Sequence, residues 1–302
     1  MKVIVTGGAG FIGSHLVDAL IDRGDYVHVI DNLSSGKIHH INPSAKFHEI
    51  ELTSPKVIDL IDKIKPEYVF HLAAQADVSK STLFPLEDLK ANVAGTVNIL
   101  EACRVSGVKK IIFSSTSAVY GNTGSEMIKE DTIASPISFY GLSKLTAEYY
   151  IKLYHESFSI PYTILRYGNV YGPRQTSKGE GGVIAVFLEK LKNKEKLKVN
   201  GDGLQTRDFI YVGDVVSANI AASNSEVNAT MQISTGCSTS VLQLIDLIKQ
   251  IHPLPVEYYH SHDRFGDIKH SCLDNRLAIK TLNWEPVHSI GEGIRKTYQS
   301  FH

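Results

Sequence analysis

Several features that would point away from a soluble enzyme are missing from this chain of 302 residues. It has no run of about 18 consecutive apolar residues, which a membrane-spanning helix requires. Glycines begin at Gly7, too early for the apolar segment of a secretory signal peptide. Its 31 Lys and Arg residues nearly balance its 32 Asp and Glu residues, so no excess charge favours nucleic acid or an anionic membrane. We therefore expect a soluble protein that binds neither.

Cysteine is scarce, and no pattern of metal ligands is visible. Cys103, Cys237 and Cys272 are an odd number, lie far apart and form no Cys-x-x-Cys motif. We expect each to be a small buried or half-buried residue in a reducing, cytoplasmic environment. The 13 histidines are scattered without the cysteines or carboxylates of a metal site, so no metal is expected. Hydrophobic residues, by contrast, make up 43% of the chain, enough for a large core.

The amino terminus has the pattern strand, glycine turn, helix. The β-branched run Lys2–Thr6 is followed by Gly7-Gly-Ala-Gly-Phe-Ile-Gly13 and then by helical periodicity. Glycines in such a turn allow the backbone to approach a pyrophosphate, which the free N–H groups of the helix can bind. The next expected strand, residues 26–30, ends in Asp31, where a carboxylate would bind the adenosine ribose and repel a 2′-phosphate. This pattern predicts NAD rather than NADP, with Lys37 the one residue that argues mildly against it.

Strands and helices alternate through the rest of the first half. We expect strands at residues 47–52, 68–72, 110–115 and 161–166, with helices at 57–64 and 86–105. This alternation predicts an α/β protein with a Rossmann-type doubly wound parallel sheet, whose site lies at the carboxyl ends of the strands. Residues 168–182 are expected to form a loop, residues 241–251 a helix, and residues 231–234 a last strand of the sheet.

Tyr140 and Lys144 lie four residues apart at the start of an expected helix. This spacing places both side chains on one helical face. Lowering the pKa of a tyrosine from about 10 to about 7 requires roughly 4 kcal/mol of preference for the phenolate. A cation about 5 Å away supplies on the order of 3 kcal/mol at an effective dielectric constant near 20. The pair can therefore form a general base, although Tyr-x-x-x-Lys alone is a common pattern.

Six short motifs stand in one order along the chain and together carry a family resemblance. They resemble the extended short-chain dehydrogenase/reductase superfamily over essentially the whole chain, and within it the UDP-sugar 4-epimerases. The motifs are Thr6-Gly-Gly-Ala-Gly-Phe-Ile-Gly13, His71-Leu-Ala-Ala74, Asn92, Ser114-Ser-Thr116, Tyr140-x-x-x-Lys144 and Arg166-Tyr-Gly-Asn-Val-Tyr-Gly172.

The resemblance implies a role for each matching residue. Tyr140 would be the general base and acid, Lys144 would hold the nicotinamide ribose and lower the tyrosine pKa, and Thr116 would hydrogen-bond the sugar. Asn92 resembles the residue that bends the helix and holds a water near this lysine. Glu51 stands where relatives usually carry aspartate against the adenine. The implied NAD contacts are Gly7, Gly10, Phe11, Ile12, Gly13, Asp31, Asn32, Leu33, Ser34, Ser35, Gly36, Glu51, Leu52, Leu72, Ala73, Ala74, Gln75, Asn92, Tyr140, Lys144 and Tyr167.

The carboxyl-terminal half is expected to bind the nucleotide sugar. Arg207 and Arg264 resemble the arginines that bind the diphosphate, and Asp267 the aspartate that binds the uridine ribose. The implied substrate contacts are Thr116, Tyr140, Asn169, Val183, Arg207, Arg264, Asp267 and Ser271. We expect residues 1–167 to form the NAD-binding domain, with 209–235 returning to it, and residues 168–208 and 236–302 to form the substrate domain.

The resemblance implies reversible inversion at C4 of a UDP-hexose. Ser271 replaces a bulky tyrosine that restricts some relatives to UDP-glucose and UDP-galactose, so we expect the N-acetylated sugars to be accepted too. A 4,6-dehydratase is disfavoured, because Ser117 and Ala118 stand where its Asp-Glu pair would follow Thr116. A UDP-glucuronate 4-epimerase or decarboxylase stays open, as does a non-catalytic NAD-binding protein. The resemblance also implies a homodimer formed through residues 86–105 and 139–158.

Overall fold

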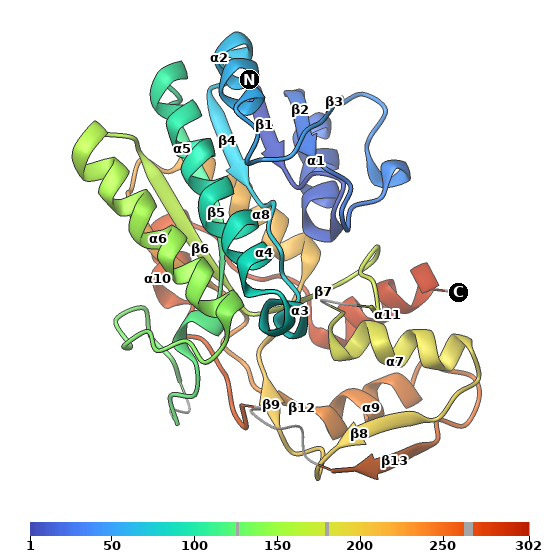
Figure 1. The fold of residues 1–302 in the computed structure, drawn as a ribbon. Coiled ribbons are helices and arrows are strands. Elements are labelled where there is room, and N and C mark those ends of the chain that lie inside the picture. The colour runs from blue at the N-terminus through green and yellow to red at the C-terminus, as the bar shows by residue number, and fades with distance from the viewer. Residues whose placement is uncertain (125–126, 179–180, 263–267, 302) are drawn as a thin grey trace.

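A parallel sheet of seven strands forms the centre of the molecule, in the order β11-β6-β5-β4-β1-β2-β3 (Figure 1). The computed structural model describes residues 1–124, 127–178, 181–262 and 268–301. Because β1 pairs with both β2 and β4, the strand order reverses beside it, which is where ligands of doubly wound sheets bind. The strands are β1 (Lys2–Thr6), β2 (Tyr26–Asp31), β3 (Lys46–Glu49), β4 (Tyr68–His71), β5 (Lys110–Thr116), β6 (Tyr162–Tyr167) and β11 (Ala229–Ile233).

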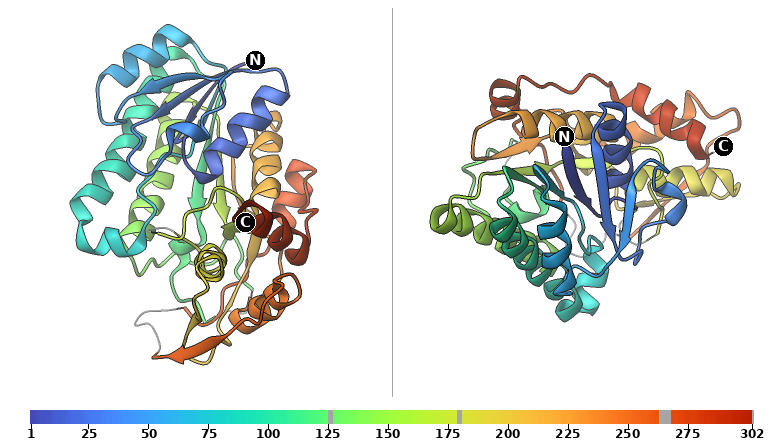
Figure 2. Two further views of the ribbon diagram at one scale, coloured as in Figure 1. Left: turned by 90° about the vertical axis from the view of Figure 1, so that its right-hand side faces the viewer. Right: turned by 90° about the horizontal axis from the view of Figure 1, so that it is seen from above.

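Helices cover both faces of this sheet, as the view from above shows (Figure 2). On one face lie α1 (Phe11–Asp22), α8 (Val212–Asn224) and α10 (Arg276–Leu282), which share a buried core with the strands. On the other face lie α2 (Lys56–Ile64), α5 (Gly95–Ser106) and α6 (Phe139–Phe158). The strands are rich in Val and Ile because they are buried on both faces, as parallel strands usually are.

A smaller group of elements packs below the carboxyl ends of the strands in Figure 1. Its core is formed by apolar side chains of three helices and of three strands, separate from the two cores of the sheet. The helices are α7 (Val183–Lys192), α9 (Val241–Lys249) and α11 (Ile290–Phe301), and β8 (Leu197–Asn200) pairs with β13 (Tyr258–Ser261). Four short strands connect this group to the sheet: β7 (Asn169–Tyr171), β9 (Thr206–Arg207), β10 (Phe209–Tyr211) and β12 (Thr239–Ser240).

The expected fold class is confirmed, with local corrections. The single helix expected at 86–105 is instead α4 (Pro85–Leu89), a π-helical turn η2 (Lys90–Ala94) and α5. The strand expected at 47–52 ends at Glu49, because the chain turns at the next residues and Ser54 N donates to Glu51 O. The loop expected at 168–182 contains β7, which pairs with β10 in parallel. The remaining helices are η1 (Ile38–His40), α3 (Val78–Leu83) and η3 (Ser117–Tyr120).

Two further expectations concern cysteines and domains. Cys103 and Cys272 are buried as expected, but Cys237 is exposed, which corrects the prediction for that residue. The proposed boundaries between an NAD domain and a substrate domain stay a prediction.

Among the described residues, no helix combines the length and the apolar character needed to cross a membrane.

Candidate active site

The glycine loop between β1 and α1 is closely packed against its surroundings. Gly7 has φ +73°, a conformation that side chains other than glycine rarely adopt, and a Cβ atom there would lie 2.7 Å from Ala73 N. A Cβ on Gly13 would lie 2.1 Å from Gly7 O. Gly10 precedes the first residue of α1, and Ser14 N donates to its carbonyl. The loop therefore needs its glycines, and it places the amino end of α1 directly after β1, at the carboxyl edge of the sheet.

Asp31 ends β2 beside this loop. Its carboxylate accepts hydrogen bonds from Ala9 N at 3.0 Å and Leu33 N at 2.8 Å. Burial raises the pKa of Asp31, and these N–H donors lower it, so they compensate part of the desolvation of the charge. Asn32 Nδ2 donates to Glu51 Oε2 at 2.5 Å, so these two predicted contacts of the adenosine lie together at the same rim.

His71 and Asn92 connect the strand ends to the helices behind them. Thr96 Oγ1 donates to Asn92 O, so it accepts from His71 Nε2, and His71 Nδ1 accepts from Thr6 Oγ1. This network assigns His71 as a neutral imidazole with its proton on Nε2. The assignment agrees with the pKa of His71, which burial lowers to about 3. The Asn92 side chain accepts from Gln75 N and donates to Ser143 Oγ of α6. The residues after β4 are thereby fixed to the helix that carries Tyr140.

Tyr140 and Lys144 lie in the first two turns of α6. Ser138 caps this helix by accepting a hydrogen bond from Gly141 N, and Tyr140 is half-buried while Lys144 is buried. The Lys144 ammonium lies 4.1 Å from the centroid of the Phe113 ring. Burial lowers the pKa of Lys144 to about 7, although the carboxylates of Glu148 and Asp88 raise it. Half-buried Thr116, at the end of β5, accepts from Ala118 N with its hydroxyl.

A buried ion pair behind these residues was not predicted from the sequence. Glu148, one helical turn beyond Lys144, pairs with Arg166 of β6, with Nη2 to Oε2 at 2.6 Å and Nε to Oε1 at 2.9 Å. Ser115 Oγ also donates to Glu148, and Arg166 Nη1 donates to Tyr120 OH. The pair thus ties α6 to β5, β6 and η3. The one signal in the sequence that could have indicated a buried charge here is the position of Glu148, four residues after Lys144 and therefore on the same helical face.

The predicted substrate contacts come from separate segments. Asn169 is exposed in β7, Val183 is the first residue of α7, and half-buried Arg207 donates to its neighbour's carbonyl, Thr206 O. Ser271 is buried, and its N–H donates to Thr206 O at 3.2 Å, which places it beside Arg207. Arg264 and Asp267 lie outside the described residues.

The family model described as the NAD dependent epimerase/dehydratase family matches residues 3–234. The chain belongs to this family. It is therefore an NAD-dependent enzyme, as its glycine loop and Asp31 predict.

Three solved structures illustrate the range of this family. A UDP-glucose 4-epimerase from Thermotoga maritima, solved with UDP-glucose, is 43% identical, with a TM-score of 0.95 over 100% of this chain and 98% of that one. A UDP-N-acetylglucosamine 4-epimerase from Methanobrevibacter ruminantium is 37% identical, with a TM-score of 0.95 over 99% and 97%. A UDP-glucuronic acid 4-epimerase from Bacillus cereus, solved with UDP-glucuronic acid and NAD, is 30% identical, with a TM-score of 0.91 over 100% and 99%.

The residues of this family member fit NAD. The glycine loop has no room for Cβ atoms at Gly7 and Gly13. The Asp31 carboxylate at the end of β2 accepts from Ala9 N on one oxygen and from Leu33 N on the other, and a carboxylate has further lone pairs that can accept from a ribose. Leu72, Ala73, Ala74 and Gln75 follow β4 and are half-buried, as are Phe11 and Ile12, whereas Leu52 is buried. Asn32, Ser34 and Ser35 are exposed on the loop after β2, and Leu33 and Gly36 are half-buried. Tyr167 is instead buried, and its hydroxyl is hydrogen-bonded to Asn219 of α8.

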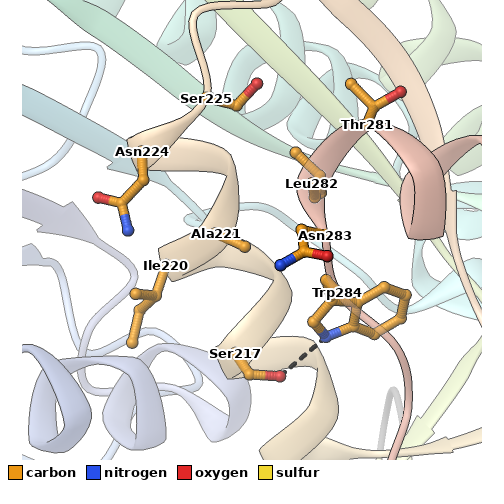
Figure 3. A pocket seen from close by; sticks show the side chains of 9 residues that line it. All are labelled: Ser217, Ile220, Ala221, Asn224, Ser225, Thr281, Leu282, Asn283 and Trp284. Carbon is orange, nitrogen blue, oxygen red and sulfur yellow. Dashed lines mark hydrogen bonds between the residues drawn. The ribbon is translucent and has the colours of Figure 1, made fainter.

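A groove of about 480 Å³ lies away from all of these residues, between α8 and residues 281–284 (Figure 3). Trp284 Nε1 donates to Ser217 Oγ at 2.8 Å and to Asp214 O at 3.1 Å, which fixes the indole against α8. None of the residues that line this groove is a candidate site residue, so we assign it no part in the chemistry.

Proposed function

We propose that this enzyme reversibly inverts C4 of UDP-hexoses: UDP-glucose to UDP-galactose, and UDP-N-acetylglucosamine to UDP-N-acetylgalactosamine. The observation that carries the proposal is the placement of Tyr140 and Lys144 on one face of α6, with Thr116 ending the neighbouring strand β5. These residues supply a base and a hydroxyl contact in a family that uses NAD.

Tyr140 would act first as base and then as acid. Its phenolate takes the proton of the C4 hydroxyl as a hydride leaves C4, which gives a 4-keto sugar. When bound, NAD would supply the redox chemistry, as acceptor and then donor of this hydride. After the sugar has turned over, Tyr140 returns the proton to the C4 oxygen while the hydride enters the opposite face of the carbon. No net oxidation results, so the reaction needs little or no added cofactor.

Lys144 would stabilise the phenolate. Its amine is buried one helical turn from Tyr140. Burial lowers its pKa to about 7, and the carboxylates of Glu148 and Asp88 act in the opposite direction and favour the ammonium form. Each pKa unit by which the cation lowers the pKa of tyrosine corresponds to about 1.4 kcal/mol of preference for the phenolate. Thr116 would hold the sugar hydroxyl beside this pair.

Ser271 supports acceptance of the N-acetylated sugars. Its side chain is small, and its backbone is hydrogen-bonded beside Arg207, the proposed partner of the diphosphate. A tyrosine at this position would fill space that an acetyl group needs. UDP-glucuronate is the alternative substrate, because hydroxyls and backbone N–H groups can also bind a carboxylate.

Proton NMR of the purified enzyme tests the proposal. UDP-glucose, UDP-N-acetylglucosamine and UDP-glucuronate are incubated in separate tubes without added NAD, and the anomeric signals are followed. We expect conversion of the first two. Conversion of UDP-glucuronate alone would establish the alternative, and no conversion in any tube, even with NAD added, would contradict the proposed activity.

We also propose that the enzyme is a cytoplasmic homodimer. Leu142, Tyr149 and Leu153 are exposed along one stripe of α6, and Leu86 and Leu89 are exposed on the adjacent α4. Light scattering should give the mass of a dimer for the wild-type protein. Leu153→Glu should give a monomer, whereas Leu254→Glu, at an exposed leucine on another surface, should leave the mass unchanged.

A further inference from the structure

Asp208 is a buried carboxylate that the proposed chemistry does not use. It lies between β9 and β10 and is 1% exposed. Its Oδ1 accepts from Thr235 N at 2.9 Å and from Thr235 Oγ1 at 2.7 Å, and its Oδ2 accepts from Gly236 N at 2.9 Å. Leu273 N and Cys272 Sγ approach Oδ2 at 3.5 and 3.8 Å. One side chain therefore joins the turn after β11 to the segment that follows Ser271.

The backbone around Asp208 reaches the predicted substrate contacts. Asp208 O accepts from Asn169 N at 2.7 Å, which aligns β7 with β10. The preceding residue is Arg207, which pairs with Thr239 in the antiparallel contact between β9 and β12. Thr206 O accepts from Ser271 N. Each predicted substrate contact is thus close to Asp208 along the backbone. Arg207 is its neighbour in the chain, Asn169 is hydrogen-bonded to its carbonyl, and Ser271 is hydrogen-bonded to Thr206, two residues before it.

The charge of Asp208 is held by its donors. Burial raises its pKa, while the N–H groups of Thr235, Leu273 and Gly236 and the Thr235 hydroxyl lower it. An amide at this position would place an NH₂ group against one set of these donors and leave buried N–H groups without an acceptor. The two segments would have to separate, and Arg207 would move with them.

We propose that Asp208 is a positioning residue for nucleotide-sugar recognition: it fixes Asn169, Arg207 and Ser271 relative to one another. The inference rests on the proposed function, because these residues are the expected contacts of the UDP-sugar. Asp208 does not touch the substrate itself, so its loss should weaken binding and leave the chemical step at Tyr140 nearly unchanged.

The test compares Asp208→Asn with Asp214→Asn. Asp214 is a matched control: it is also 1% exposed, and it accepts from Val287 N, His288 N and His288 Nδ1. Both variants should lower the melting temperature. Asp208→Asn should raise KM for the UDP-sugar and the Kd of UDP by about tenfold or more with kcat within about threefold, as loss of uniform binding requires. Asp214→Asn should leave KM for the UDP-sugar and the Kd of UDP within about twofold of their wild-type values.

Two further variants keep the test decisive. Arg207→Ala should weaken UDP binding, and adding Asp208→Asn to it should have little further effect on the Kd of UDP, because Arg207 is the contact to the diphosphate through which Asp208 acts. If Asp208→Asn does not fold, Thr235→Val removes one donor from the carboxylate and should raise the Kd of UDP while retaining NAD. Unchanged UDP affinity in Asp208→Asn, or in Thr235→Val where that variant replaces it, overturns the inference. A wild-type protein that neither binds UDP nor epimerises a UDP-hexose overturns the proposed function as well.

Discussion

The two sides of the candidate site are built differently. On the cofactor side, Gly7 follows β1 and Asp31 ends the neighbouring strand β2, so their positions follow from the sheet itself. On the substrate side, Asn169, Arg207 and Ser271 lie on two-stranded pairs or loops, joined through Asp208 and Thr206. The first side lies on the large cores of the sheet, and the second on short strands that pack on the smaller core and are joined to one another by a few hydrogen bonds.

This difference predicts how each side responds to change. Substitutions of buried residues on the cofactor side should affect global stability, because the same buried elements hold the site and the fold, whereas half-buried catalytic residues should affect the reaction alone. Substitutions on the substrate side should affect affinity and specificity, because small shifts of these segments leave the sheet intact. Equal responses on both sides would mean that the distinction is wrong.

The largest effect is expected for Tyr140→Phe. Loss of the phenol should lower kcat by about 10²–10⁴-fold, the usual contribution of general acid–base catalysis. The NAD content and the melting temperature should stay unchanged, because Tyr140 is only half-buried. Tyr26→Phe is the control, since Tyr26 is 76% exposed at the start of β2. A Tyr140→Phe enzyme that epimerises at the original rate would refute the proposed mechanism.

Glu148→Gln should cause the next largest loss, in stability. Removing one partner of a buried ion pair leaves the Arg166 charge uncompensated and typically costs about 3–5 kcal/mol. The control is Asp62→Asn, which removes the exposed Lys65–Asp62 pair and should cost less than about 1 kcal/mol. Urea unfolding of the three proteins measures both values. Similar losses in the two variants would show that the buried pair does not support the cofactor side as we describe.

A smaller effect is expected on the substrate side, for Ser271→Tyr. The larger ring should lower kcat/KM for UDP-N-acetylglucosamine by on the order of tenfold to a hundredfold, the range that a steric change in a binding pocket produces. Activity on UDP-glucose serves as the internal control. Ser271→Ala should leave kcat/KM unchanged for both substrates. If Ser271→Tyr keeps full N-acetyl activity, another wall of the pocket determines the specificity.

The smallest effect is expected from pH. The pKa of buried His71 is lowered to about 3, so below its unfolded value near 6.5 the unfolded chain binds a proton that the folded chain does not. Stability should therefore decrease as the pH falls, by about 0.7 kcal/mol between pH 7 and pH 6 from this residue. His71→Gln should reduce the pH dependence of urea unfolding, and His39→Gln, at an exposed position, should not. If His71→Gln has the same pH dependence of unfolding as the wild-type protein, other titrating groups cause that dependence.

Much of the cofactor side was predictable from the sequence because its signals are local. The glycine spacing, the acid at the end of the second strand and the Tyr140–Lys144 spacing each describe one turn or one helix, and the structure places them at one edge of the sheet. The errors arose where long-range contacts decide the local conformation. Asn92 is bonded to Gln75 and Ser143 within a π-helical turn, and β7 exists because β10 pairs with it.

The sequence by itself determined the fold class and the preference for NAD, because strand and helix periodicities and short glycine and acid motifs require only neighbouring residues, and six motifs in one order carried the resemblance to the family. Only the tertiary structure decided that Glu148 pairs with Arg166 and that Asp208 joins the segments of Asn169, Arg207 and Ser271. Such contacts link residues 18 to 65 positions apart, where no periodicity connects them. Their partners are chosen by the need to satisfy buried charges and N–H groups once the chain has folded.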